Sequence, residues 1–286
     1  MKPVHRDLQD MTHSAGAMHA TDGTAGTHPP ERLPACYAIV PAAGKGTRMG
    51  ASVRKQFLEL DGVPVLIRTL SAFERSALID GILVAAGADE TASVETMCTR
   101  YGITKLLGVV AGGATRFLSV TNAIDALERL LPAHIPAGRD AQSTGGAATG
   151  GPVVLIHDGA RPFIQEEVIR ACAEAAARFG AAICGVPVKD TVKIVGKDGR
   201  IGSTVPREGL WAVQTPQAFR LHEISAMHRE AAARGMDFTD DAQVAEHFGH
   251  DVHMVMGDYT NIKLTTSEDL ILGDAILRHQ KAAGSR

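Results

Sequence analysis

A glycine-rich turn with two nearby cations is the first place in this sequence where chemistry could be done. An apolar run ends at Pro41 and is followed by Ala-Ala-Gly-Lys-Gly-Thr-Arg-Met-Gly, which contains Gly44, Gly46 and Arg48, and Lys55 follows seven residues after that arginine. A glycine pair after a strand is also typical of a simple tight turn, but its backbone N–H groups can approach phosphate closely. Two cations beside the turn repel each other unless an anion lies between them, and a nucleoside triphosphate supplies several negative charges. The pattern therefore predicts a phosphate site.

The spacing excludes two other phosphate-binding motifs. A P-loop needs a glycine, four residues and then Gly-Lys-Ser/Thr, whereas Lys45 lies between the two glycines of this turn. A dinucleotide fingerprint needs Gly-x-Gly-x-x-Gly, and Gly50 comes one position late. No acidic residue closes a second strand about 20 residues further on. A nicotinamide-dependent oxidoreductase is therefore a remote alternative.

The segments around this turn alternate between strand-like and helix-like patterns. Short apolar runs predict buried strands at 36–41, 81–86, 106–110, 153–157, 181–187 and 253–256. Apolar residues three and four apart predict helices over 117–131 and 168–179, and further helices are expected near 221–234, 241–248 and 267–277. This alternation predicts an α/β fold with a Rossmann-like, mostly parallel sheet and helices on both faces. The glycine turn then lies at the carboxyl ends of the strands, where such sheets bind ligands.

Three segments depart from the alternation. Residues 1–33 show no apolar period, so we expect a disordered N-terminal tail before a single domain over 34–286. Residues 132–152 are rich in Gly and Ala and predict a flexible surface loop. Within 189–210, two strand-like runs flank an Asp198-Gly199 turn and predict a projecting β-arm. Because a lone hairpin is marginal in water, a second subunit is the expected support, which predicts a homodimer.

Composition limits the classes of partner. The chain has 286 residues, with 29 basic and 32 acidic side chains and a formal net charge of −3. A general nucleic-acid binder concentrates basic charge on its surface, so we expect a small-molecule partner and no nucleic acid. No apolar run approaches the roughly 20 residues needed to span a bilayer, and no secretory signal is visible, so we expect no membrane and a cytoplasmic protein.

The cysteines and histidines give no metal signature. The four cysteines are far apart in the sequence, and we expect them to be small buried hydrophobes: Cys36, Cys98, Cys172 and Cys184. Three histidines recur every three residues, at His247, His250 and His253, but Gly249 interrupts the helix that would align them, so we expect them to be exposed. Asp240 and Asp241 follow Thr239 and suit a helix N-terminus.

Seven motifs then follow one another in a recognisable order. They are Pro41–Met49 with Lys55-Gln56, Gly112–Val120, His157–Pro162, Pro187–Thr191, Leu210–Gln217, Thr239–Asp241 and Asn261–Lys263. In this order they resemble the 2-C-methyl-D-erythritol 4-phosphate cytidylyltransferase family, over residues 36 to 277. The resemblance implies a nucleotidyltransferase-type fold and an enzyme of non-mevalonate isoprenoid precursor synthesis.

The resemblance also implies a reaction and a set of site residues. A phosphate oxygen of methylerythritol phosphate would attack the α-phosphorus of CTP and release pyrophosphate, with Mg²⁺ bridging the phosphates. Arg48 and Lys55 would be catalytic, because they would stabilise charge on the α-phosphate. The implied nucleotide-binding residues are Pro41, Ala42, Ala43, Gly44, Gly46, Gly112, Gly113, Ser119, Asp158 and Gly159. The implied acceptor-binding residues are Asp158, Arg161, Thr191, Arg207, Thr215, Thr239 and Lys263, with Arg207 reaching across a dimer interface.

Other interpretations stay open at the level of the sequence. Asp158 could cap the helix that follows it, and Arg116 could be ordinary helix-start chemistry. A cytidylyltransferase for another polyol phosphate, such as ribitol 5-phosphate, would handle CTP in the same way. A non-catalytic nucleotide sensor could retain the glycine turn, but it would not need the acceptor-side residues.

Overall fold

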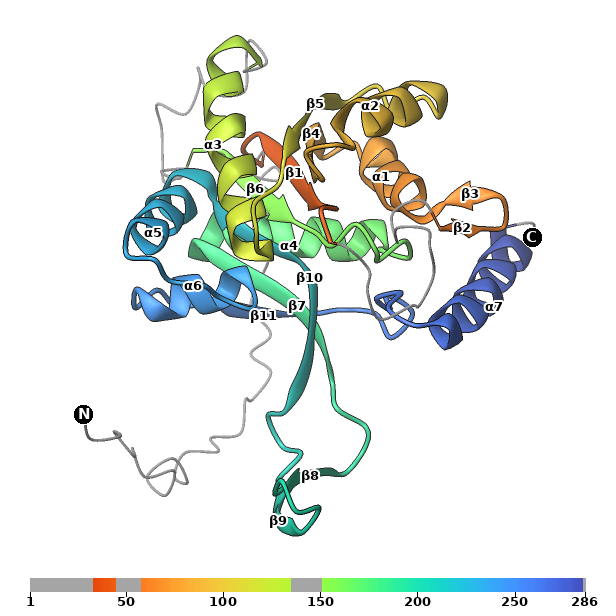
Figure 1. Ribbon diagram of the computed structural model, residues 1–286, viewed down its shortest axis with the longest axis vertical. Helices are drawn as coiled ribbons and strands as arrows, with labels where there is room; N and C mark the ends of the chain where they lie inside the picture. Colours follow the sequence, from red (N-terminus) through yellow and green to blue (C-terminus); the bar gives the residue numbers. More distant parts are fainter. Residues whose placement is uncertain (1–32, 45–57, 135–150, 285–286) are drawn as a thin grey trace, which may run out of the picture. The chain divides into compact units, whose positions relative to one another are not determined.

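A seven-stranded sheet forms the centre of the fold (Figure 1). The computed structural model describes residues 33–44, 58–134 and 151–284. The strands lie in the order β11-β7-β10-β6-β1-β4-β5, and every neighbouring pair is parallel except the two pairs that contain β10. Their bounds are β1 Cys36–Pro41, β4 Ile79–Ala86, β5 Leu106–Ala111, β6 Val153–Ile156, β7 Ala181–Pro187, β10 Trp211–Arg220 and β11 His253–Met256.

Helices cover both faces of the sheet. One face carries α1 Val65–Arg75, α2 Thr91–Arg100 and α4 Glu166–Phe179, and the other carries α3 Arg116–His134, α5 Leu221–Ala233 and α6 Asp241–His247. Side chains of β1 alternate between the two cores, with Ala38 and Val40 on the α1 face and Tyr37 and Ile39 on the α3 face. Burial on both faces explains why the strands are near-continuous apolar runs in the sequence.

The α/β fold and the elements predicted from the sequence are confirmed, and the main omission is β10. This strand lies between β6 and β7 and runs antiparallel to both. It contains Pro216, which cannot donate a ladder hydrogen bond, and the pairing with β7 shifts register between Val213 and Gln217. The proline and the polar residues around it hid a central strand from the pattern analysis.

Several other helices and strands were also not predicted from the sequence. The sequence analysis predicted neither α1 nor α2, nor the short hairpin of β2 Glu59–Leu60 and β3 Val63–Pro64. Helix α3 continues to His134, so it enters the predicted loop at 132–152. Most of that loop and the tail at 1–32 lie outside the described residues. Leu33, the last residue of the predicted tail, is partly buried and packs against the core cluster that includes residues of α1 and α4. The C-terminal helix α7 Ser267–Gly284 joins a third cluster with Leu60, Phe163 and Leu264.

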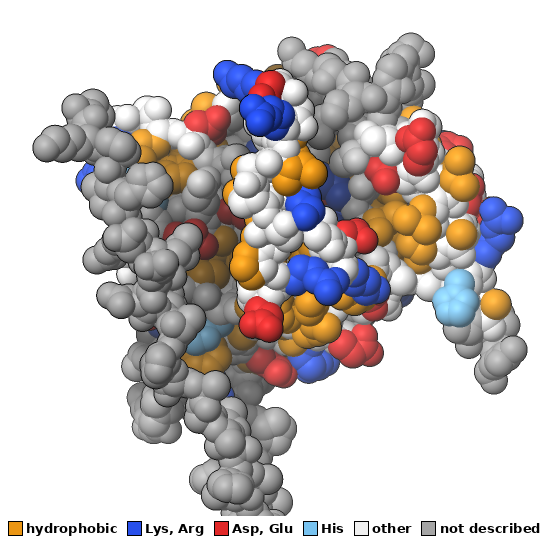
Figure 2. Space-filling view, turned by 90° about the horizontal axis from the view of Figure 1, so that it is seen from below, with side chains coloured by type: hydrophobic (Ala, Val, Ile, Leu, Met, Phe, Trp, Pro, Cys, Tyr) orange, Lys and Arg blue, Asp and Glu red, His pale blue; other side chains and the backbone are white. Residues whose placement is uncertain are grey.

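The predicted hairpin is confirmed. Strands β8 Val192–Val195 and β9 Ile201–Val205 pair antiparallel in a sheet of their own, beyond the ends of β7 and β10 (Figure 1). The side chains of Ile194 and Ile201 are 59% and 65% exposed. In the view from below, which faces the arm, hydrophobic side chains lie between Lys and Arg side chains (Figure 2). The arm therefore presents apolar surface that the described residues do not cover.

The cysteines and the three regularly spaced histidines lie in the surroundings that the sequence predicts. All four cysteines are buried and free, as predicted. His247, His250 and His253 are exposed, also as predicted. No helix among the described residues is long and apolar enough to cross a membrane.

Candidate active site at the carboxyl ends of the parallel strands

Backbone hydrogen bonds join the loops after β1, β5 and β6 to the carboxyl ends of β1 and β4. The N–H of Ala42 donates to Ala85 O at 2.7 Å, and the N–H of Gly112 donates to Ala86 O at 2.7 Å. The N–H of Gly159 donates to Pro41 O at 3.2 Å. Three of the predicted nucleotide-binding segments therefore meet at one edge of the sheet. Of the glycine turn itself, residues 41–44 are described, whereas Gly46, Arg48 and Lys55 lie outside the described residues.

The loop after β5 needs glycine for steric reasons. A Cβ at Gly112 would lie 2.6 Å from Ala43 Cβ, and a Cβ at Gly113 would lie 2.4 Å from Leu118 Cβ. Ser119 fastens the loop, because its Oγ accepts from the N–H of Gly113 at 3.0 Å and donates to Thr115 O at 2.8 Å. The backbone of Gly112 consequently lies against Ala43 at the start of the glycine turn, and that of Gly113 lies against Leu118 of α3.

Asp158, in the loop after β6, is surrounded by three cations. Lys263 Nζ lies 2.9 Å from Oδ2 and Arg161 Nε lies 3.3 Å from Oδ2, while Arg116 Nε lies 3.5 Å from Oδ1. Burial alone would raise the pKa of Asp158, whose side chain is 10% exposed, but the charges of Lys263, Arg116 and Arg161 outweigh it and hold the pKa well below its usual range. The carboxylate is therefore ionised at neutral pH and can accept hydrogen bonds from substrate hydroxyls.

A buried histidine and a threonine fix the loop that carries this aspartate. The N–H of Asp158 donates to Thr215 Oγ1 at 3.0 Å, and His157 Nδ1 lies 3.1 Å from the same hydroxyl oxygen. His157 Nε2 lies 3.0 Å from Arg161 O, which can only accept, so Nε2 carries the proton and the Thr215 hydroxyl donates to Nδ1. Burial lowers the pKa of His157 to about 4, which keeps the ring neutral.

The structure excludes the capping interpretation of Asp158. Helix α4 begins at Glu166, and its N-cap is Gln165. Asp158 is instead joined to residues from two later segments: Thr215 on β10 and Lys263 after β11. Arg161 links Asp158 to the segment after β11, because its Nε lies 3.3 Å from Asp158 Oδ2 and its Nη1 donates to Asn261 O at 2.8 Å.

Four of the predicted acceptor residues meet here, and three do not. Asp158, Arg161, Thr215 and Lys263 contact one another directly or through one residue. Thr191 and Arg207 are exposed at the base of the arm, where Arg207 Nη1 donates to Lys189 O at 2.7 Å. Thr239 is exposed and bonded to Gln243 Oε1. Within the described part of the chain, none of these three forms a hydrogen bond or an ion pair with Asp158.

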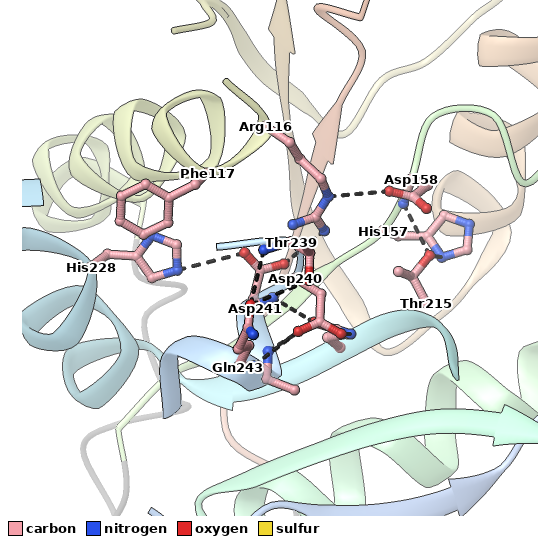
Figure 3. A network of polar contacts seen from close by, with 12 residues as sticks. Arg116, Phe117, His157, Asp158, Thr215, His228, Thr239, Asp240, Asp241 and Gln243 are labelled. Atoms are coloured by element: carbon pink, nitrogen blue, oxygen red, sulfur yellow. Dashed lines mark hydrogen bonds and ion pairs between the residues drawn. The ribbon is translucent and has the colours of Figure 1, made fainter. Parts of the chain in front are cut away.

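Sequence reasoning missed Arg116, Asp241 and His228 (Figure 3). Arg116 is the first residue of α3, and its side chain bridges Asp158 and Asp241. Its Nη2 donates to Asp241 Oδ2 at 2.7 Å. Asp241 is 1% exposed and is the first residue of α6. Asp240 is the N-cap of this helix, which confirms the prediction that the two aspartates lie at a helix N-terminus. The motifs at 112–120 and 239–241 contain two of these residues, but a buried ion pair between them cannot be inferred from one sequence.

The described residues do not form a protein-held metal site. No group of three His, Cys, Asp or Glu side chains within the described ranges could hold a metal ion. The two carboxylates at the site, Asp158 and Asp241, are both paired with cations. Lys263 is the most exposed of the three cations, with 42% of its side chain accessible, so its ammonium can also contact an anionic ligand.

The mostly parallel sheet and the cation-held aspartate at its carboxyl edge define an α/β protein of the nucleotidyltransferase type. A solved structure of 4-diphosphocytidyl-2C-methyl-D-erythritol synthase from Anaerococcus prevotii DSM 20548 matches with a TM-score of 0.69 and 32% identity, covering 86% of this chain and 96% of that one. A structure of 2-C-methyl-D-erythritol 4-phosphate cytidylyltransferase from Thermus thermophilus matches with a TM-score of 0.63 and 30% identity, over 84% of this chain and 98% of that one.

Comparison of sequences indicates the same class of protein as the solved structures do, and it identifies one family within that class. A 2-C-methyl-D-erythritol 4-phosphate cytidylyltransferase from Geobacter metallireducens is 44% identical over 247 residues, which are 86% of this chain and 99% of the relative. The profile of the 2-C-methyl-D-erythritol 4-phosphate cytidylyltransferase family matches residues 36–132 and 143–279. The chain belongs to this family, and the resemblance drawn from the seven motifs is confirmed.

Proposed function

We propose that this chain transfers the cytidylyl group of CTP to 2-C-methyl-D-erythritol 4-phosphate, giving 4-diphosphocytidyl-2-C-methyl-D-erythritol and pyrophosphate. A phosphate oxygen of the acceptor attacks the α-phosphorus, a new P–O bond forms, and the bond to the bridging oxygen of the β-phosphate breaks. Family membership supports this proposal. The observation that carries it is the convergence of Asp158, Arg161, Thr215 and Lys263 beside the loops at 41–44 and 112–113.

The nucleotide occupies the edge formed by the loops after β1 and β5 in this proposal. The backbone from Pro41 to Gly44 and the turn that follows cradle the triphosphate, while the bare backbone at Gly112 and Gly113, fastened by Ser119, faces the cytosine. Arg48 and Lys55 stabilise the charge that develops on the α-phosphate. No covalent intermediate is needed, because alignment and charge stabilisation account for phosphoryl-type transfer.

In this proposal the acceptor occupies the part of the site that contains Arg161 and Lys263. Arg161 and Lys263 attract its phosphate, and the Lys263 side chain is 42% exposed, so its ammonium can reach a ligand. Asp158 accepts hydrogen bonds from hydroxyl groups, and Thr215 holds the Asp158 backbone in place. Thr191, Thr239 and Arg207 complete the acceptor pocket in this proposal.

Magnesium would be held chiefly by the phosphates of the nucleotide. Mg²⁺ prefers several waters and phosphate oxygens over a protein cage, and it would neutralise part of the triphosphate charge when bound. Since the described residues do not offer a protein-held site, the steps above are assigned to the chain's own side chains.

We also propose that residues 34–286 act as one cytidylyltransferase domain that dimerises through the arm. A two-stranded hairpin is marginally stable alone, and Ile194, Val195 and Ile201 expose more than half of their surface on it. Covering these side chains with a second copy would bring Arg207 towards the partner's acceptor site. Because the reaction consumes CTP, we place it in the cytoplasm. Sedimentation should give a dimer for the wild-type protein and a monomer for Ile201→Asp, and a wild-type monomer would contradict this assembly.

The transfer itself is tested by incubating the purified protein with CTP, Mg²⁺ and candidate acceptors. Release of pyrophosphate with methylerythritol phosphate is expected, and ³¹P NMR should show the new diphosphate diester. Lys55→Ala or Arg48→Ala should lower kcat about 100-fold or more, the usual loss for one preorganised donor. Turnover with ribitol 5-phosphate alone would overturn the choice of acceptor. CTP binding without turnover of either acceptor would favour a sensor. Near-normal kcat in either variant would overturn the catalytic roles.

A further inference from the structure

His228 is a fully buried titratable side chain that the proposed reaction does not use. It lies on α5, is 0% exposed, and stacks on Phe117 with ring centroids 4.9 Å apart (Figure 3). Its Nδ1 is 3.0 Å from Thr121 Oγ1, and its Nε2 faces Asp241 Oδ1 at 3.6 Å. Neither Nε2 nor Oδ1 has a hydrogen-bond partner within the described residues. Two buried polar atoms that face each other and have no other partner form a pair whose role needs an explanation.

The proton positions follow from the neighbours. Burial lowers the pKa of His228, so the ring is neutral and carries one N–H. Asp241 Oδ1 can only accept, and a lone pair on Nε2 would repel it. The Thr121 hydroxyl has two acceptors within reach, Phe117 O and His228 Nδ1, each at 3.0 Å. It can turn its hydrogen towards Nδ1, because the Phe117 carbonyl lies inside α3 and also accepts a backbone N–H. The arrangement that satisfies both contacts therefore places the proton on Nε2, pointing at Asp241.

From Asp241 the contacts continue to the acceptor site. Its other oxygen, Oδ2, is bound by Arg116 Nη2 at 2.7 Å, and Arg116 Nε is 3.5 Å from Asp158 Oδ1. Burial would lower the pKa of Arg116, but Asp241 and Asp158 raise it, so the guanidinium stays charged. Its Nη1 is buried and has no partner in the described ranges, so the two carboxylates alone orient the group.

We propose that His228 is a positioning residue for the transfer reaction: its Nε2–H holds Asp241, Asp241 orients Arg116, and Arg116 sets the Oδ1 of Asp158 for the acceptor hydroxyls. The four side chains come from α5, α6, α3 and the loop after β6, so this chain of contacts ties helices of one face to the edge that binds substrate. The inference rests on the proposed function, since it needs Asp158 to contact the acceptor.

The test variant is His228→Phe, which keeps a ring against Phe117 and removes the N–H. We expect the KM for methylerythritol phosphate to rise about 10-fold, within the range of coupling energies measured for contacting residues, while the KM for CTP changes by less than about twofold. A purely structural defect would lower the active fraction, which reduces apparent kcat and leaves both KM values unchanged. His228→Gln, which can present an amide N–H towards Asp241, should recover most of the acceptor KM.

Two controls make the outcomes distinct. His222→Phe, at an exposed position on the same helix, should leave both KM values unchanged. Histidine-selective ¹⁵N NMR of the full chain should show His228 protonated at Nε2, independently of any substrate. An unchanged acceptor KM in His228→Phe, or a proton on Nδ1 alone, would overturn this inference and leave the proposed function intact. A wild-type protein that cannot use this acceptor would overturn the proposed function, and with it the positioning role.

Discussion

His157 gives the most quantitative prediction, because it is completely buried in a site that accepts only its neutral form. The ring bridges Thr215 and Arg161 O behind the loop that carries Asp158. Burial lowers its pKa from 6.5 to about 4. Acidification should therefore destabilise the folded protein through this one side chain, and replacing it with Gln, which does not titrate, should remove that contribution.

The sign and size follow from proton linkage. Above pH 6.5 the ring is neutral in both folded and unfolded chains, so it adds no pH dependence. Between pH 6.5 and 4 the unfolded chain binds a proton that the folded chain refuses, so the free energy of unfolding falls as the pH falls. At about 1.4 kcal/mol per pH unit, the total loss is about 3 kcal/mol by pH 4.

Urea unfolding of the wild-type protein and His157→Gln at pH values from 7.5 to 4.5 would measure this loss. Carboxylates and the other buried histidine titrate in both proteins, so they cancel in the difference between the two. At pH 7.5 the variant should be less stable, since it loses well-formed hydrogen bonds, and the gap should narrow by about 2 to 3 kcal/mol towards pH 4.5. A gap that stays constant with pH would refute the assignment of His157 as a neutral, buried ring.

Three further predictions concern the site and its limits. Asp158→Asn should lower kcat/KM at least about 100-fold, measured from steady-state rates. The same variant should lower the free energy of unfolding by about 3 kcal/mol, measured by urea unfolding, because three cations lose their buried counter-charge. Gly113→Ala should cost about 1–3 kcal/mol of stability, since its Cβ would lie 2.4 Å from Leu118 Cβ. Gly108→Ala, whose Cβ would meet only an ordinary contact at 3.8 Å, is the matched control for Gly113→Ala, and equal melting temperatures for the two variants would contradict the steric argument. Deleting residues 1–32 should leave melting temperature and activity unchanged, and a loss of either would show that the tail supports the domain.

The parallel part of the fold could be predicted because its physical signals are local. Strands such as β1 and β6 are buried on both faces and appear as continuous apolar runs, and α3 and α4 keep a clear helical period. Strand β10 could not be predicted, since Pro216 and its polar neighbours argue against a central strand. Only the register shift opposite β7 explains how the proline is accommodated.

The candidate site also contains residues that the sequence could predict and residues that it could not. The motif around Asp158 could be located because the end of an apolar strand is where α/β sheets bind ligands. Its surroundings could not, because Arg116 and Lys263 are separated from it by 42 and 105 positions and meet it only through tertiary packing. His228 gave no signal at all, since one histidine within an amphipathic helix is indistinguishable from an ordinary core residue.

The most direct measurement of the central claim is a crystal structure of the protein grown with CTP. We expect the triphosphate against the turn that follows Pro41, with Arg48 and Lys55 on the α-phosphate, and the cytosine against the backbone at Gly112 and Gly113. The acceptor side, at Asp158 and Lys263, should remain open towards the α-phosphorus. A nucleotide bound elsewhere on the molecule, with this edge of the sheet empty, would contradict the account.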